Sequence, residues 1–410
     1  MDAFIARQPI FDRHQNLRAF ELLFRSGLKN AFQGLDADQA SSKVIADSLL
    51  LHGLDTLTQG RPAFINVTRD LLVEDLVSVL PPTSTVLEIL ETTEPDAELV
   101  TACVRLRKQG FRIALDDFRF HPRWERLLDC VDIVKVDVLA AGSAERASLA
   151  KRLQGHGITL LAEKIETQAM FRETAELGYE LFQGYAFARP AIVSGHDIPA
   201  LKLHYLEMLR EIHAPELDLR TIETIVTREI ALTYKLLRYI NASFFGWRGS
   251  VSSVHHALLL LGEREFRKWA SVVALAGMAG DKPEALVTEA LLRARFCEQL
   301  APVVGLGPRA DDLFITGMFS LLDAFLDRPL RSILEGLPVN EEVKAALLGG
   351  PGVPRDVLEI VVAYNSAQWA ALQDPCSRLG ISDAVLPSLY ASAVEWVGAG
   401  PEPTNLRQAA

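Results

Sequence analysis

The first half of this chain alternates short β-rich segments with helical segments, and no other feature limits its possible folds as strongly. The β-rich segments are bounded by turn residues and comprise 4–11, 17–24, 63–67, 85–90, 112–118, 133–137, 158–165 and 181–187. The helical segments comprise 38–51, 68–79, 96–108, 144–154 and 168–177. Strands that alternate with helices favour a mostly parallel sheet, and the polar turn after the first strand is typical of a hairpin. These strands are enough for a closed barrel, so the first half predicts an α/β fold of the TIM-like (β/α)8 type.

The second half has a different pattern, because from about residue 201 it is helical nearly throughout. Its candidate helices carry apolar residues at three- and four-residue spacing and comprise 217–241, 253–276, 284–300, 311–326, 340–348, 357–372 and 383–397. A connector containing Pro and Gly, residues 191–199, precedes them. We therefore expect a barrel domain over 1–195, an all-α domain over 196–400 and a disordered tail over 401–410.

Composition narrows the class of protein. Of the 410 residues, 49% are hydrophobic and 23% are charged, as in a soluble globular protein with a large core. The formal net charge of -11 repels phosphate backbones, so we expect no nucleic-acid polymer as a partner. No apolar run is long enough to span a bilayer, and no signal-peptide pattern opens the sequence. The four cysteines are scattered without metal-binding spacing, so we expect a cytoplasmic protein with no membrane partner.

Polar side chains stand at the C-terminal ends of the predicted strands. They are Glu21, Asn66, Glu91, Asp116 with Asp117, Lys135 with Asp137, Glu163 with Glu166, and Gln183. In a parallel barrel these ends meet on one face, where active sites form. Oxygen ligands without Cys or His suit Mg²⁺ or Mn²⁺, and two such ions about 3.5–4 Å apart would activate water against a phosphodiester. Each carboxylate taken alone is also explained as a cap of the following helix, but acids on strand after strand favour a shared site.

These residues belong to motifs that resemble the EAL domain family, which hydrolyses or binds cyclic di-GMP. The motifs lie in family order over about residues 1–195. They comprise Arg7-Gln8-Pro9-Ile10, Glu21-Leu22-Leu23-Phe24-Arg25, Ile65-Asn66-Val67, Leu87-Glu88-Ile89-Leu90-Glu91, Leu115-Asp116-Asp117-Phe118, Val134-Lys135-Val136-Asp137, Ala162-Glu163-Lys164-Ile165-Glu166-Thr167 and Gln183-Gly184-Tyr185. The number and order of the motifs make the match specific.

The resemblance implies a role for each matched residue. The implied ligands of two Mg²⁺ or Mn²⁺ ions are Glu21, Asn66, Glu91, Asp116, Asp117 and Glu163. Lys135 would orient the attacking water, with Glu21 and Glu163 also taking part in catalysis. The implied contacts to cyclic di-GMP are Gln8 with a guanine, Arg25 with a phosphate, and Asp137, Glu166 and Gln183 elsewhere on the ligand. Glu94 takes the place of a glutamate that supports a loop, and related barrels often form homodimers.

Three departures from the family pattern bear on activity. The alanine of the family signature is Leu22 in this chain. The family's Gly-Thr-Gly type loop, which organises the metals and the dimer interface, is replaced by Arg119-Phe120-His121-Pro122-Arg123. Lys164 replaces a glycine, and a lysine beside the ligands can compete with a cation. The ligands are thus present while the loop that supports them is rebuilt, which leaves ligand binding better supported than turnover.

The second half resembles the HDOD domain family. The matching segments are Leu236-Leu237-Arg238-Tyr239-Ile240-Asn241-Ala242 and residues 251–262. HDOD domains are similar to a metal-dependent HD phosphohydrolase core without its metal ligands, and Ser320-Leu321-Leu322 stands where an HD doublet would be expected. We interpret the adjacent His255 and His256 as helix-surface residues, because neighbours on a helix point about 100° apart. The second half is thus predicted to bind an unknown protein partner rather than to hold a second active site.

Three functions are compatible with these observations. The leading hypothesis is a bacterial cyclic di-GMP phosphodiesterase that forms linear pGpG, with the HDOD half as a regulatory module. The second is a receptor or adaptor that binds cyclic di-GMP without hydrolysis, motivated by the rebuilt segment 119–123. The third is an unrelated metal-dependent barrel hydrolase, since fold alone does not fix function.

Overall fold

The computed structural model describes residues 4–25, 54–184, 200–215, 219–227, 230–241 and 251–399. The expected helix over 38–51 and the expected tail over 401–410 lie outside these residues. The described chain forms two compact units. The first unit contains Met1–Ala191 together with Val362–Glu395, and the second contains Ile192–Val361 together with Trp396–Ala410. This division differs from the single boundary expected near residue 195, because a segment late in the sequence belongs to the first unit.

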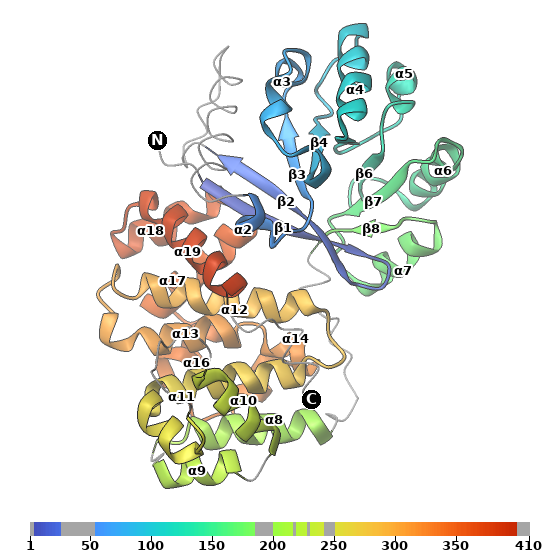
Figure 1. The fold of residues 1–410 in the computed structure, drawn as a ribbon. Helices are drawn as coiled ribbons and strands as arrows, with labels where there is room; N and C mark the ends of the chain where they lie inside the picture. The colour runs from blue at the N-terminus through green and yellow to red at the C-terminus, as the bar shows by residue number, and fades with distance from the viewer. Residues whose placement is uncertain are drawn as a thin grey trace. The chain divides into compact units, whose positions relative to one another are not determined.

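A closed barrel of eight strands forms the centre of the first unit (Figure 1). The strands are β1 (Phe4–Asp12), β2 (Leu17–Arg25), β3 (Ala63–Val67), β4 (Thr85–Ile89), β5 (Arg112–Leu115), β6 (Ile133–Asp137), β7 (Thr159–Glu163) and β8 (Leu181–Phe182). Strand β1 is antiparallel to both β2 and β8, and all other neighbours are parallel. The predicted barrel and hairpin are therefore confirmed.

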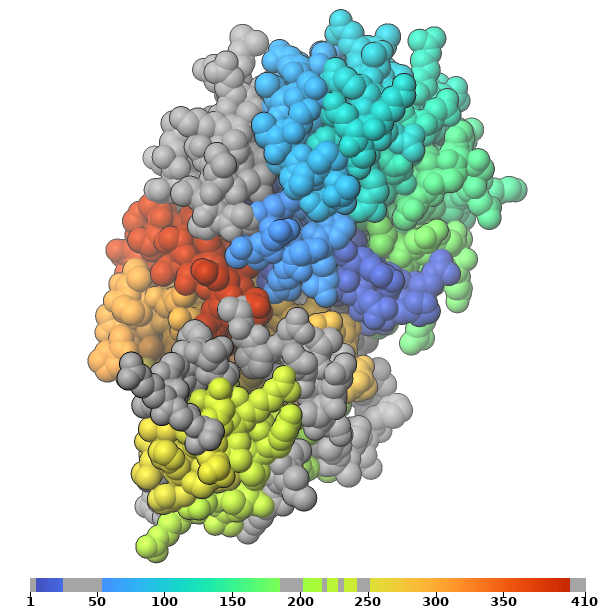
Figure 2. Space-filling view, in the orientation of Figure 1, coloured from blue at the N-terminus to red at the C-terminus, as the bar shows by residue number. Residues whose placement is uncertain are grey.

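Helices cover the outside of the barrel. They are α2 (Leu54–Thr58), α3 (Arg69–Val73), α4 (Ala97–Gln109), α5 (Glu125–Leu128), α6 (Ser143–Leu153) and α7 (Gln168–Glu176), with short 3₁₀ turns between them. Helix α4 has a clear start and stop, since Asp96 accepts a hydrogen bond from the Leu99 N–H and Gly110 ends the helix at φ 102°. Helices α3 to α6 form a continuous surface on the visible face of this unit (Figure 2). The sequence did not indicate α2 or α5, which are each a single turn.

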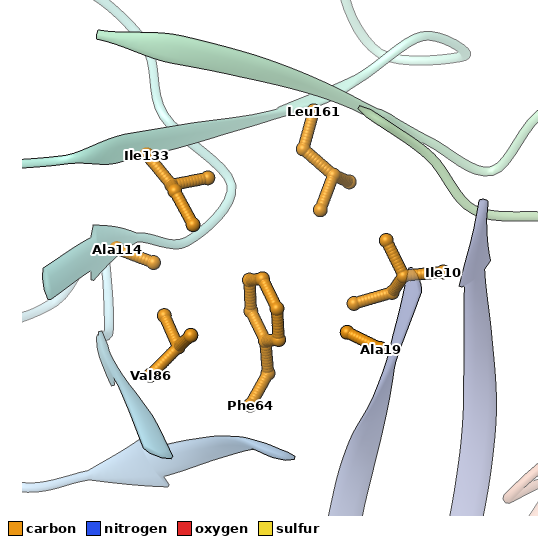
Figure 3. Close-up of a cluster of buried hydrophobic side chains, with 7 residues drawn as sticks. All are labelled: Ile10, Ala19, Phe64, Val86, Ala114, Ile133 and Leu161. Atoms are coloured by element: carbon orange, nitrogen blue, oxygen red, sulfur yellow. The ribbon is translucent and has the colours of Figure 1, made fainter. Parts of the chain in front are cut away.

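The barrel interior is filled with side chains. One apolar layer takes a residue from each strand: Ile10, Ala19, Phe64, Val86, Ala114, Ile133 and Leu161, with Leu181 packed against them. Phe64 lies in the middle of this layer, with small and branched side chains around it (Figure 3). All seven are at most 3% exposed. The barrel is therefore a packed core that closes one end of any site built above it.

The segment Val362–Glu395 completes the first unit with helices from the end of the sequence. It contains the end of α17 (Val353–Asn365), α18 (Gln373–Leu379) and most of α19 (Leu386–Ala399). Tyr364 and Tyr390 are fully buried there, with ring centroids 4.8 Å apart. The predicted helix over 383–397 is thus present. The predicted helix over 357–372 instead ends at Asn365 and is followed by a separate 3₁₀ turn, Trp369–Leu372, and the structure adds α18.

The second unit is helical throughout its described part. Its helices are α8 (Ala200–Ile212), α9 (Leu219–Thr227), α10 (Ile230–Ile240), α11 (Val254–Met278), α12 (Glu284–Leu300), α13 (Ala310–Phe319), α14 (Leu322–Leu326), α15 (Leu330–Leu334) and α16 (Glu341–Leu347), followed by the first part of α17. The predicted helix over 311–326 is two helices, and α11 is kinked at Gly262, where φ is 74°. None of the helices in the described ranges combines the length and apolar character that crossing a bilayer requires.

Candidate active site of the barrel

A polar layer lies directly above the apolar layer of the barrel, because each strand places residues two apart on the same side. Moving two residues along β2 to β7 from the apolar layer reaches Glu21, Asn66, Glu88, Asp116, Lys135 and Glu163. The same step along β8 reaches Gln183, while in the antiparallel β1 it runs backwards and reaches Gln8. One strand register therefore explains how residues far apart in the sequence come together.

Lys135 lies at the centre of this polar layer and is fully buried. Its Nζ is 2.7 Å from Glu88 Oε1, 2.8 Å from Asp116 Oδ1, 3.0 Å from Glu163 Oε1 and 3.4 Å from Glu21 Oε2. One ammonium thus faces four acidic side chains. We call Lys135, Glu21, Glu88, Asp116 and Glu163 the inner cluster.

The inner cluster shifts the pKa values of its members. Burial would lower the pKa of Lys135, but Glu163, Glu21, Glu88 and Asp116 together outweigh burial and raise it well above its usual value. Burial, with help from the charge of Glu21, raises the pKa of Glu88 far above that of an exposed carboxyl. Burial also raises the pKa of Glu163 to about 8, against the opposing effect of Lys135. These shifts show that the barrel holds more acidic groups than one lysine can neutralise.

A chain of amides connects the inner cluster to Gln8. Gln183 Nε2 donates to Glu21 Oε2 and to Gln8 Oε1, each at 2.7 Å. Asn66 Nδ2 donates to Glu21 Oε1 at 3.3 Å. Gln8 Nε2 in turn donates to the Ser366 carbonyl at 3.4 Å, so the late segment Val362–Glu395 contacts this chain of amides.

The backbone at the end of β8 explains why a glycine follows Gln183. A Cβ on Gly184 would lie 2.2 Å from the Ile165 nitrogen, and its φ is 149°. Ile165 N donates to the Gln183 carbonyl at 3.0 Å, which fixes this close approach. Only glycine fits where two barrel segments touch in this way, so Gly184 holds Gln183 in place.

A second, outer group of charges lies beside the inner cluster. Lys164 Nζ is 2.5 Å from Asp137 Oδ2 and 3.6 Å from Asp117 Oδ1. Burial opposes ionisation of Asp137, but hydrogen bonds from Lys164 and from the Ala140 and Leu139 N–H groups outweigh burial and lower its pKa. We call Asp117, Asp137 and Lys164 the outer cluster.

A cavity of about 620 Å³ lies beside both clusters and is walled by the rebuilt segment 119–123. Its polar lining includes Glu91, Asp116, Asp117 and Asp137. The wall is held by Trp124, which is buried against the edge of Phe118. Arg123 donates to the Glu91 carbonyl at 3.2 Å, and its guanidinium lies 5.1 Å from the centre of the Trp124 ring. The replacement loop is therefore an ordered wall with basic side chains next to the acidic residues.

The structure brings together some of the predicted site residues and not others. Joined directly by hydrogen bonds or ion pairs are Gln8, Glu21, Asn66, Asp116, Lys135, Glu163 and Gln183, with Asp117 and Asp137 joined in the outer cluster. Glu91, Glu94 and Glu166 have exposed side chains. Within the described residues, no ion pair or hydrogen bond connects those three side chains to either cluster. The side chain of Arg25 lies outside the described residues.

Glu88 is the site residue that the sequence reasoning missed. That reasoning considered strand ends, while Glu88 lies inside β4, beside Asn66 in the strand register. A signal was available, because Glu88 follows the buried Val86 by two residues, as Glu21 follows Ala19. A charged residue in phase with the apolar positions of a strand therefore indicates a barrel interior site.

The described barrel residues fit divalent cations by their chemistry. The candidate ligands offer only oxygen, which suits Mg²⁺ and Mn²⁺. Asn66 Oδ1 and Asp117 Oδ1 are buried and accept no hydrogen bond. In the described part of the chain, no three acidic, His or Cys side chains are arranged so that they could hold a metal ion, because the Lys135 ammonium lies among the acids of the inner cluster. The site thus has oxygen atoms that are available as metal ligands, and the Lys135 ammonium already lies among its acidic side chains.

The second unit has a cavity of its own, of about 430 Å³, lined by α11, α13 and the segment around α16. His213, at the end of α8, borders it, and burial followed by the charge of Arg267 lowers its pKa to about 4. Asn241 joins the two segments of the HDOD-like motif. Its side chain accepts a hydrogen bond from Val251 N and donates one to the Val251 carbonyl, each at 2.7 Å. His255 and His256 are exposed on α11, as expected.

Comparison with known proteins connects both units to known families. Residues 5–190 match the EAL domain and residues 198–324 match the HDOD domain. The chain is 35% identical over 380 residues to the cyclic di-GMP phosphodiesterase CdgJ of Vibrio cholerae, covering 92% of this chain and 88% of that protein. It is 33% identical over 406 residues to the uncharacterized protein YuxH of Bacillus subtilis, covering 97% and 98% of the two chains.

A solved structure is also similar. It is a calcium and cyclic di-GMP complex of BlrP1 from Klebsiella pneumoniae, 25% identical, with a TM-score of 0.40 over 46% of this chain and 56% of that one. From the domain matches and the full-length relatives, this chain belongs to the family of two-domain EAL–HDOD proteins. This membership excludes the unrelated barrel hydrolase considered above.

Proposed function

We propose that this chain is a divalent-cation-dependent phosphodiesterase that hydrolyses cyclic di-GMP to linear pGpG. The observation that carries the proposal is the inner cluster, in which four acidic side chains surround one ammonium. The Vibrio cholerae relative, which is named for this activity, supports the choice of substrate. In the reaction, one water adds across one P–O3′ bond, so its oxygen joins phosphorus and a proton reaches the leaving 3′ oxygen.

The residues proposed to hold two Mg²⁺ or Mn²⁺ ions are Glu21, Asn66, Glu91, Asp116, Asp117 and Glu163. The buried, unpartnered oxygens of Asn66 and Asp117 support this choice. Such ions, when bound, lower the pKa of water and stabilise developing negative charge on phosphate. Glu91 is exposed at the cavity rim, so its part in the site depends on the loop that follows β4.

The chain's own side chains supply positioning. We propose that Lys135 donates a hydrogen bond to the attacking water, with Glu88 holding the ammonium at 2.7 Å. Glu21 and Glu163 would share the catalytic work as acidic partners of Lys135. Gln8 would contact a guanine, and Gln183 ties that amide to Glu21. Arg25 would bind a phosphate, while Asp137 and Glu166 would contact the ligand and Glu94 would support the loop after β4.

The test is conversion of cyclic di-GMP to pGpG by the full-length, manganese-loaded protein, measured by chromatography. Glu21→Ala removes an acid of the inner cluster, and we expect at least about a hundredfold loss of turnover. Glu176→Ala on the exposed face of α7 is the matched control and should leave the rate unchanged. Absence of pGpG from the pure, metal-loaded wild-type protein would refute the proposal.

A second candidate is a receptor that binds cyclic di-GMP without hydrolysis. It is favoured by the basic wall 119–123 and by Lys164, which already neutralises part of the outer cluster. Calorimetric titration of cyclic di-GMP in the presence of Ca²⁺ separates the two, because a receptor binds with no product when Mn²⁺ replaces Ca²⁺. Arg25→Ala should then abolish binding.

The four cysteines are buried and form no disulfide, which fits a reducing, cytoplasmic compartment. We propose that the barrel over 1–195 acts on the nucleotide, that it pairs as a homodimer, and that the helical part over 196–400 docks a protein partner. Size-exclusion chromatography with light scattering tests the homodimer.

A further inference from the structure

Lys164 has a backbone conformation that is unfavourable for a lysine. It follows the last residue of β7, and its φ is 56°, in the left-handed region. A glycine adopts this conformation without steric cost, whereas other residues pay roughly 1 kcal/mol or more. The neighbouring hydrogen bonds from Val138 N to the Glu163 carbonyl and from Ile165 N to the Gln183 carbonyl fix the backbone there. The chain thus keeps a long cationic side chain where the backbone conformation favours glycine.

The contacts of the Lys164 ammonium give a physical reason for a lysine at this position. It makes an ion pair with Asp137 at 2.5 Å and lies 3.6 Å from Asp117 Oδ1. Asp117 is also in a left-handed conformation, with φ 42°, and its Oδ1 accepts no hydrogen bond. Two residues with left-handed backbones therefore face each other across the outer cluster, and the carboxylate of one of them keeps an acceptor without a hydrogen bond.

The two lysines of the site differ in how easily they can move. Lys135 is fully buried within the inner cluster, while the Lys164 side chain is 50% exposed. An exposed ammonium on a four-carbon stem can turn into solvent at small cost, because water replaces its partners. Lys164 is therefore a removable cation, whereas Lys135 is a permanent one.

We propose that Lys164 is a built-in competitor for a divalent cation at Asp117. Its ammonium pairs with Asp137 and lies close to Asp117 in the metal-free protein, and it must move away from Asp117 when a cation binds that carboxylate. The inference uses the proposed function only in taking Asp117 as a ligand. Because the ion pair is partly exposed, the competition is modest, and we expect it to weaken cation binding about five- to tenfold.

The experiment is calorimetric titration of Mn²⁺, and separately Ca²⁺, into the full-length, metal-stripped protein and three variants. Lys164→Gly removes both the charge and the backbone strain. Lys164→Asn removes the charge but keeps a side chain that tolerates a left-handed backbone. Lys164→Arg keeps the charge. Cation affinity should rise about five- to tenfold in the Gly and Asn variants and should not rise in the Arg variant.

Several outcomes would overturn the inference. Unchanged affinity in both Lys164→Gly and Lys164→Asn would show that Lys164 does not compete. A lower melting temperature of the metal-free Asn variant without any gain in cation affinity would mean that the ion pair only stabilises the fold. Absence of cation binding in the wild type and in all variants would also refute it.

The same experiment separates this inference from the proposed function. The titrations use cations alone and need no turnover, so they remain informative if wild-type protein forms no pGpG. Asp117→Asn is the reference variant and should weaken cation binding whether or not Lys164 competes. Combining it with Lys164→Gly should remove the gain, because the contested carboxylate is then absent.

Discussion

The two units both contain clusters of charged side chains, but they balance the charges differently. In the barrel, Lys135 is the one cation among four acids. In the helical unit, the basic Lys268, Arg264 and Arg295 share the acidic Glu265, Glu298 and Asp311, so the numbers are equal. A balanced cluster is satisfied by the chain itself, while an unbalanced one gains stability from an added cation. We therefore expect the barrel cluster, and not the helical network, to bind added cations.

The largest effect is expected from Lys135→Met, which removes the cation of the inner cluster. The acids of the cluster that remain ionised would then be buried without a counter-charge, and we expect the metal-free protein to lose about 3–5 kcal/mol of unfolding free energy. Saturating Mn²⁺ should restore a larger share of the melting temperature in this variant than in wild type, since the ions replace the missing charge. Turnover should fall at least about a hundredfold, because the water loses its hydrogen-bond donor.

Thermal unfolding with and without Mn²⁺ measures both quantities. The comparison of the two units fails if metal-free Lys135→Met has the same melting temperature as the metal-free wild type. It also fails if Mn²⁺ raises the two melting temperatures equally.

A smaller effect is expected from Lys268→Met in the helical unit. Lys268 contacts Glu298 and lies 2.9 Å from Asp311 Oδ1, and its side chain is 15% exposed. Removing it leaves partly buried acids, which should cost about 2–3 kcal/mol. Added Mn²⁺ should not recover this loss, and pGpG formation should be unchanged at a temperature where the variant is folded. Recovery by Mn²⁺ would show that the helical network also binds cations.

The smallest effect concerns the pH dependence of the helical unit. His213 donates its Nε2–H to Ser271 Oγ, because the Ser271 hydroxyl is already donated to the Arg267 carbonyl. With a folded pKa of about 4 and an ordinary value near 6.5, the unfolded chain binds the proton first as pH falls. Stability should therefore decrease below pH 6.5, by about 1 kcal/mol at pH 5.5.

Denaturant unfolding from pH 5 to 7.5 measures this slope. His213→Asn should flatten the part of the curve between pH 5 and 6.5. If wild type and variant keep parallel curves over that window, His213 is not the group responsible.

The barrel was predicted well from the sequence, because short apolar runs between turn residues indicate its strands. It also predicted most of the helices, with the break between α13 and α14 missed because Ser320 and Leu321 do not interrupt an apolar pattern. It did not place Val362–Glu395 in the barrel unit. An apolar stripe on a helix predicts that it is buried, but not which surface buries it.

The site was predictable in proportion to how rigidly the backbone holds each side chain. Glu21, Asn66 and Glu163 lie on strands, so strand register alone brings them together. Glu91 and Glu166 follow strands by a few residues, where loop conformation decides their direction, and both side chains are exposed. The contact of Lys164 with Asp137 depends on a left-handed backbone and on the direction of a long, flexible side chain. A sequence motif predicts neither of these.

The return of Val362–Glu395 to the barrel unit has a consequence for how the chain acquires its structure. The hydrogen bond from Gln8 to Ser366 joins residues 358 positions apart, so it closes a loop that contains nearly all of the helical unit. During synthesis from the N-terminus, the barrel strands emerge long before the segment that completes their unit. Such distant contacts slow folding, because the entropy cost of closing the loop comes before the stabilising contacts form. The surroundings of Gln8 are therefore complete only after the segment Val362–Glu395 has been synthesised.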